Sequence, residues 1–216
     1  MGPAWFVLLF LTILFAYVDV WYFVRLFTLF LRTQLKSGGS HGSRSKRGTP
    51  RQALLSPYDV RGIVLPSDID YMCHMNNSKY LRVMDYGRIG LGLETGFREA
   101  LREAGGHMVL AAASIRYRRS LKLFQRFLLR TRVLCWDESA LYMEQRVLQS
   151  DGFVSAIMLA KMAIRGTTVP HLMKMVVGET MESPPFPLEV ATWCESTTAS
   201  SQSLRRESEQ KRVGLK

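Results

Sequence analysis

The sequence predicts an α+β protein, one folded domain behind a hydrophobic N-terminal segment, and three observations support this class. Its 216 residues are 47% hydrophobic, which is enough for one core and too much for a disordered chain. One long stretch with helical periodicity is followed by four stretches with the alternating periodicity of strands. The three cysteines are far apart and form no C-x-x-C pair, which excludes a zinc ribbon or a disulfide-stapled mini-domain.

Residues 1–36 are predicted to be a hydrophobic anchor. Pro3 to Val18 carries no charge, and apolar residues resume after Asp19, so the segment approaches the ~20 residues that span a bilayer. No Lys or Arg precedes it and no clear cleavage site follows, which favours an uncleaved anchor over a signal peptide. A cleaved signal peptide, which would make the domain secreted, stays open as the alternative.

The net charge of +11 is concentrated behind this segment. No acid lies between Val20 and Tyr58, a stretch with seven Lys and Arg residues, and residues 59–216 hold the remaining 22 basic and 17 acidic side chains. A basic flank after a hydrophobic run places the following domain in the cytosol. We therefore expect membrane lipid as a partner, attachment at the endoplasmic reticulum, and no nucleic-acid partner.

Residues 37–55 are predicted to be a flexible linker, because Gly, Ser and basic residues dominate the stretch from Ser37 to Pro50. Gly38 to Gly42 matches G-x-S-x-G, the pattern of a nucleophile elbow. That turn needs a strand before it and a helix after it. Neither is predicted here, so the match is attributed to chance.

A central helix is predicted to follow Asn76, Asn77 or Ser78, each of which can cap it. The apolar face then recurs at helical spacing through the positions Tyr80, Val83, Met84, Gly87 and Leu91. The glycines at 87, 90 and 92 allow close packing against a sheet, or else end the helix near Gly90.

Four antiparallel strands are predicted after this helix, over residues 109–117, 127–135, 141–148 and 153–164. Asp151-Gly152 indicates a tight turn before the last of them. A short strand or loop is expected before the helix, and Val169–Val177 forms a strand or a helix. The folded domain is predicted at 56–182 and a flexible polar tail at 183–216.

The most informative stretch is Asp68-x-Asp70-x-x-x-His74-x-Asn76-Asn77-x-x-Tyr80, directly before the helix. It resembles the hot-dog-fold thioesterases of the 4-hydroxybenzoyl-CoA thioesterase type and the plant acyl-carrier-protein thioesterases. The general resemblance covers about residues 58–166. It implies a hot-dog fold, in which an antiparallel sheet wraps a long central helix, and a homodimer or higher oligomer.

The resemblance also implies roles for these residues. Asp70 takes the position of a catalytic base or nucleophile, and His74 that of a functional histidine. Asn76, Asn77 and Tyr80 form the substrate and oxyanion region, where helix N–H groups polarise a thioester carbonyl. Met72 departs from the plant pattern, which has a functional asparagine there.

Structural explanations exist for each of these polar residues. Asp68 is better explained as a turn or capping residue, and Asp70 can be read in the same way. Asn76 and Asn77 suit the formation of the helix start. His74 is equally well explained as a hydrogen-bonded structural residue.

A basic stripe without acids lies between Ile115 and Thr131. Arg116, Arg118 and Arg119 are its candidates for binding the phosphates of coenzyme A. The alternatives are contact with anionic lipid and an ordinary solvated face of the sheet.

The predicted function is hydrolysis of fatty acyl thioesters of coenzyme A at a membrane surface. The alternative is a catalytically weak or inactive hot-dog module that binds acyl chains or partners and regulates lipid handling. The absence of a polar side chain at Met72 favours that alternative. Neither a cofactor nor a metal is expected.

Overall fold

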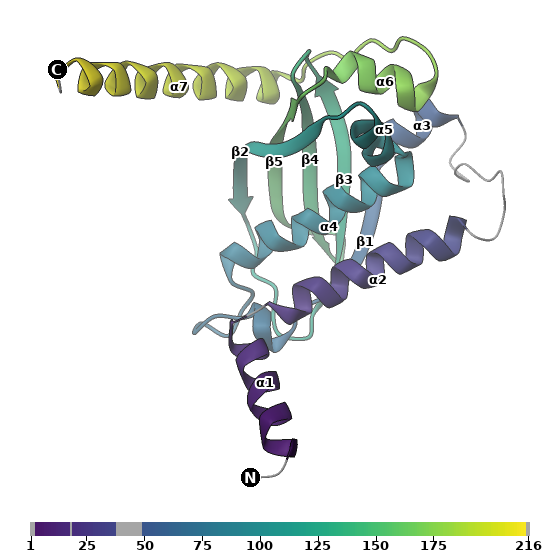
Figure 1. The fold of residues 1–216 in the computed structure, drawn as a ribbon, viewed down its shortest axis with the longest axis vertical. Coiled ribbons are helices and arrows are strands. Elements are labelled where there is room, and N and C mark those ends of the chain that lie inside the picture. Colours follow the sequence, from purple (N-terminus) through teal and green to yellow (C-terminus); the bar gives the residue numbers. More distant parts are fainter. Residues whose placement is uncertain (1–2, 18, 38–48, 215–216) are drawn as a thin grey trace.

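A computed structural model describes residues 3–17, 19–37 and 49–214 (Figure 1). Two helices precede the folded domain, and a long helix leaves it at the C-terminal end. In chain order, the elements are α1 (Pro3–Tyr17), α2 (Val20–Ser37), α3 (Pro50–Leu55), β1 (Tyr58–Ile63), the 3₁₀ turn η1 (Pro66–Asp68), α4 (Asn77–Thr95), α5 (Phe97–Glu103), β2 (His107–Tyr117), β3 (Arg126–Trp136), β4 (Ala140–Gln149), β5 (Val154–Arg165), α6 (Val169–Val177) and α7 (Leu188–Gly214).

The five strands form one antiparallel sheet in the order β1-β3-β4-β5-β2. Its four long strands start and end within two residues of the predicted bounds, and the open segment at 169–177 is a helix. Helix α4 lies across one face of the sheet (Figure 1), and the main core fills the space between them. Strands β1 and β2 are the two edges of the sheet.

A capping side chain sets the start of helix α4, and a left-handed glycine sets its end. The Asn76 side chain accepts a hydrogen bond from the N–H of Ser78 and caps the helix. The helix passes Gly90 without a break and stops at Gly96, whose φ of 75° is left-handed. Early fraying at Gly90 was therefore the wrong alternative.

Two of the three glycines allow close packing of α4 on the sheet. A Cβ at Gly87 would collide with Thr131 Oγ1 and lie 2.9 Å from Gln145 Nε2, and one at Gly90 would collide with the ring of Tyr58. At Gly92 the nearest atom would be 3.8 Å away, an ordinary contact. Gly92 is therefore not needed for packing.

These contacts predict opposite effects for two alanine substitutions. Gly87→Ala should lower the free energy of unfolding by about 1–3 kcal/mol, because Thr131 and Gln145 are buried and hydrogen-bonded and cannot yield. Gly92→Ala should raise it by up to ~1 kcal/mol through helix propensity. Thermal unfolding of both full-length variants measures this, and equal melting temperatures would contradict the packing described.

Helix α2 packs against the domain. Tyr22 stacks on Tyr86 of α4 with ring centroids 5.4 Å apart, and Leu29 belongs to the main core. Asp19, just before α2, forms ion pairs with Lys79 at 3.5 Å and Arg82 at 3.1 Å. The N-terminal segment is thus fixed to the first turns of α4.

The two N-terminal helices differ in what surrounds them. None of the described helices is individually long and apolar enough to cross a membrane. Ala4–Phe15 and Val20–Leu35 meet the criterion of length and composition together, with a bend of 83° between them. The sequence treated residues 1–36 as one unit, whereas the structure separates an exposed α1 from a docked α2.

Two predicted boundaries differ from the structure. Helix α3 lies inside the segment predicted as linker, and its Leu54 is buried in the core, so the folded part begins near Pro50. The segment predicted as a flexible tail contains α7, whose first turns place Val190 against the outer face of the sheet. Leu188 to Arg212 contains neither proline nor glycine, so nothing interrupts the helix. The flexibility of this segment stays a prediction.

Candidate active site

Asp70 and His74 lie together in a tight turn before α4. The Asp70 N–H donates to the His74 carbonyl at 3.0 Å, and the Cys73 N–H donates to the Asp70 carbonyl at 3.0 Å. Asp70 Oδ1 accepts from the Met72 N–H at 3.0 Å and lies 3.5 Å from His74 Nδ1. The Asp70 side chain is 17% exposed and that of His74 28%, so both are sheltered but reachable by water.

The amino end of α4 follows this turn directly. Asn76 satisfies the N–H groups of Ser78, through its side chain at 2.9 Å, and of Lys79, through its carbonyl at 2.9 Å. Asn77, the first residue of the helix, is exposed. Its N–H group is not one of the two that Asn76 accepts. In the sequence, the positive end of the helix dipole and the Asn77 N–H group come seven residues after Asp70.

Tyr80 links the first turn of α4 to neighbouring segments of the site. It is buried, and its hydroxyl accepts the Leu121 N–H at 3.2 Å, which joins α4 to the loop after β2. Its ring meets that of Tyr117 edge-on at 5.4 Å, and the Tyr117 hydroxyl donates to the Asn77 carbonyl at 3.0 Å. Burial raises the pKa of Tyr80 and outweighs the hydrogen bond from Leu121, so the phenol stays neutral and structural.

Asp68 is a structural residue, as the sequence favoured. Its carboxylate is buried and accepts the Leu65 N–H at 2.9 Å. It also accepts from the Arg25 guanidinium of α2 at 2.9 Å, and the same guanidinium donates to the Ile63 carbonyl at 3.2 Å. Helix α2 therefore holds the loop that leads to Asp70.

Within one protomer, the three candidate arginines do not form a single cluster beside Asp70. Arg116 pairs with Glu189 of α7 at 3.1 Å. Because the first turns of α7 pack on the outer face of the sheet, this ion pair places the Arg116 side chain on the face opposite α4. Arg119 pairs with Asp151 at 2.9 Å and lies over the Phe153 ring, as does Arg118. Arg118 and Arg119 lie in the loop after β2, which also holds Leu121.

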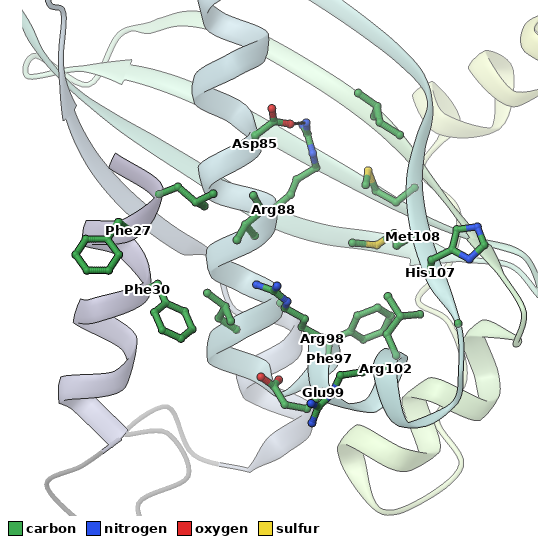
Figure 2. A pocket seen from close by; sticks show the side chains of 18 of the residues that line it. Phe27, Phe30, Asp85, Arg88, Phe97, Arg98, Glu99, Arg102, His107 and Met108 are labelled. Carbon is green, nitrogen blue, oxygen red and sulfur yellow. Dashed lines mark hydrogen bonds and ion pairs between the residues drawn. The ribbon is translucent and has the colours of Figure 1, made fainter. Parts of the chain in front are cut away.

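A groove runs along the other half of α4 (Figure 2). It has a volume of about 1360 Å³ and is lined by apolar residues of α2, by α4 from Asp85 to Leu93, by α5 and by the start of β2. Phe27 and Phe30 of α2 form one wall and Met108 of β2 part of the other (Figure 2). None of the predicted site residues lines this groove.

A buried polar network that starts from Asp85 and Arg88, which line the groove, was missed by sequence reasoning. Arg88 of α4 is buried and donates to Asp85 and to Gln145, whose amide in turn donates to Thr131 at 2.9 Å. Burial lowers the pKa of Arg88, against the opposing effect of Asp85. The available signal was the position of Arg88 four residues after Met84, on the apolar face of the predicted helix.

Known relatives support the resemblance. A family model described as thioesterase-like superfamily matches residues 64–194. The chain is 38% identical to Protein THEM6 of Xenopus laevis over 196 residues, with 90% of this chain and 89% of that protein covered. It is 39% identical to Protein THEM6 of Danio rerio over 197 residues (91% and 92% covered).

The chain belongs to the thioesterase-like superfamily. Protein THEM6 of Drosophila melanogaster is a more distant relative, 34% identical over 200 residues, with 91% of this chain and 96% of that protein covered.

Solved structures agree on the hot-dog fold that the sequence predicts. A protein described as an oleoyl thioesterase from Lactobacillus plantarum aligns with a TM-score of 0.53 at 14% identity, covering 62% of this chain and 55% of that one. A gentisyl-coenzyme A thioesterase aligns with a TM-score of 0.50 at 16% identity, covering 56% and 100%. A hypothetical protein from Thermus thermophilus gives 0.51 at 16% identity, covering 57% and 96%.

Proposed function

We propose that this protein hydrolyses fatty acyl thioesters of coenzyme A at a membrane surface. The observation that carries the proposal is the sheltered Asp70–His74 pair at the amino end of a buried helix, in a chain of the thioesterase-like superfamily. A carboxylate that water can reach, next to helix N–H groups, is an arrangement suited to acyl transfer.

The chemistry follows from this geometry. Asp70 accepts a proton from water as the water oxygen attacks the thioester carbonyl carbon. The N–H of Asn77 and the dipole of α4 stabilise the oxyanion of the tetrahedral intermediate. The carbon–sulfur bond then breaks, and the thiolate takes the proton held by Asp70, which restores the carboxylate and leaves a free fatty acid and coenzyme A. His74 orients the Asp70 carboxylate.

The groove is suited to the acyl chain. The part of α4 between Asn76 and Asp85 is about 13 Å long at 1.5 Å per residue, a distance that a long acyl chain spans. The aromatic wall of α2 and the methionine of β2 are apolar. Arg118 and Arg119, in the loop tied to Tyr80, stay the candidates for the phosphates of coenzyme A, whereas the ion pair of Arg116 directs it to the other face.

The same groove also favours the second candidate function, binding of acyl chains without turnover, because it is separate from Asp70. Met72, the departure from the plant pattern, is 59% exposed and contributes only its N–H to Asp70. To separate the two functions, the full chain in lipid nanodiscs is assayed for thiol release from acyl-CoAs of increasing chain length. Turnover that saturates with substrate supports hydrolysis, and saturable binding without thiol release supports the binding module.

We also propose a homodimer formed along β2. This edge strand is eleven residues long and exposes Val109 and Leu110, which a lone sheet edge normally avoids. Pairing of two copies along β2 would satisfy its free backbone groups and bring the groove of one copy toward its partner.

A charge on this edge should dissociate the dimer. Val109→Glu places a carboxylate where a copy would pair and should shift the full chain in nanodiscs to one protomer per disc. Leu204→Glu on α7, also an exposed apolar position, is the matched control and should leave assembly unchanged. Mass photometry measures the shift, and a one-protomer wild type would refute the dimer.

For localisation, we propose attachment through the N-terminal helices to the endoplasmic reticulum membrane, with the domain in the cytosol. The support is the charge-free α1 and the excess of basic residues after it. Protection of a C-terminal tag from protease in intact microsomes would contradict this orientation.

A further inference from the structure

Two loops at the candidate site expose large apolar side chains to solvent. The turn after Asp70 presents Tyr71, 94% exposed, and Met72, 59% exposed, and the loop after β2 presents Leu123, 36% exposed, and Phe124, 61% exposed. We call these four residues the tip patch. Single exposed apolar residues are ordinary, whereas four on adjoining loop tips mark an interaction surface.

The loops are fixed to one another, so the patch is a built surface. The Met75 N–H donates to the Leu121 carbonyl at 2.8 Å, and His74 and Lys122 form an antiparallel bridge. The Phe124 N–H donates to the Val64 carbonyl at 2.9 Å. These bonds hold both tips on the outer side of the site.

The surroundings of the patch are cationic. Lys122 and Arg126 are exposed and form no ion pair with any described residue, and Arg118 lies over the Phe153 ring. No acid occurs between Ile115 and Thr131. Exposed aromatic and aliphatic tips flanked by free cations complement the headgroup region of an anionic bilayer.

The patch lies at the end of the molecule from which α1 departs. The ion pairs of Asp19 with Lys79 and Arg82 fix the junction of α1 and α2 beside the amino end of α4, which follows the Asp70 turn. Figure 1 shows α1 leaving downward from the lower side of the folded domain, with the start of α4 above it, and α7 leaving from the upper side. A bilayer that holds α1 therefore comes near the tip patch.

We propose that the tip patch is a second membrane-docking surface, which inserts Tyr71, Met72, Leu123 and Phe124 among the headgroups of anionic phospholipids. This surface is additional to the N-terminal helices and does not depend on catalysis. It holds the Asp70 turn against the membrane, so that an acyl thioester partitioned in the bilayer reaches the site without crossing water.

The test measures immersion depth residue by residue in the full chain. Nitroxide labels are attached at Met72→Cys or Phe124→Cys, in a background with Cys73→Asn and Cys194→Ser. The matched control is Gln202→Cys, exposed on α7 at the opposite end. Asn suits position 73 because it tolerates the left-handed φ of 59° found there. Collisions with oxygen and with a water-soluble nickel chelate are compared in nanodiscs of phosphatidylcholine with and without phosphatidylserine.

We expect the ratio of oxygen to nickel collisions at positions 72 and 124 to exceed that at 202 several-fold, and to rise when phosphatidylserine is present. Lys122→Glu with Arg126→Glu should abolish that rise. Equal ratios at all three positions would overturn the proposal, because the patch would face water. Dipolar broadening between labels at 72 or 124, independent of lipid composition, would also overturn it, because a second copy would then cover the patch.

Discussion

Asp70→Asn is expected to lower kcat/KM for acyl-CoA hydrolysis by about 10²–10⁴-fold while the fold persists. The amide oxygen of asparagine can still accept the Met72 N–H, so the turn keeps its hydrogen bond. It cannot accept a proton from water, so the proposed base is lost. Thiol release and thermal unfolding, measured on the same preparation, separate the two effects.

The matched control for this prediction is Asp59→Asn. Asp59 is a partly exposed aspartate on β1, outside the Asp70 turn, that pairs with Arg130 of β3 at 2.7 Å. It should retain wild-type turnover. Equal turnover by wild type and Asp70→Asn would show that another group performs the chemistry.

The second large effect concerns the link between α2 and the site loop. Arg25→Met should lower the free energy of unfolding by about 1–3 kcal/mol, because Asp68 would be left buried without its charged partner. For a domain of this size, that corresponds to a melting temperature lower by several degrees. Turnover should fall as well, since the loop carrying Asp70 loses its tether to α2.

Two variants make this prediction specific. Arg32→Met removes an exposed cation from the same helix and should change neither stability nor turnover. Adding Asp68→Asn to Arg25→Met removes the unpaired charge and should recover a large part of the lost stability. If Arg25→Met and Arg32→Met behave alike, α2 does not hold the site loop.

This link also bears on experimental design. A chain that begins at residue 56, where the sequence predicts the domain to start, would lack α2, α3 and the partner of Asp68. It would also lose Leu54 and Leu29 from the core. Such a chain is expected to unfold more easily, so low activity in it would say little about Asp70.

Local patterns were sufficient to predict the sheet and the central helix. Alternation in β2 to β5 and the Asn76 cap of α4 depend on neighbours in sequence, and the structure confirms them. The Asp70 turn is similarly local, since His74 is the fourth residue after Asp70. Contacts between distant segments could not be predicted in this way.

Several of the missed features are contacts between segments that are distant in the sequence. Arg25 and Asp68 are 43 residues apart, and the pairing of Asp19 with Arg82 spans 63. The hydrophobicity of residues 20–35 fits a membrane segment and a docked helix equally well. The ring contact of Tyr22 with Tyr86 and the ion pairs of Asp19 show that α2 packs on α4. The position of Arg116 on the far face became clear only from its pairing with Glu189 on α7.

The central claim is that the thioester lies at the amino end of α4, beside Asp70. Photolabelling tests it most directly, with a non-hydrolysable thioether analogue of a long-chain acyl-CoA that carries a photoreactive group next to the sulfur. The full chain in nanodiscs is irradiated and the labelled peptides are identified by mass spectrometry. Labels on residues 68–80 or on the loop at 118–125 are the predicted result, and labels confined to α2 and to the half of α4 from Asp85 onward would contradict the claim.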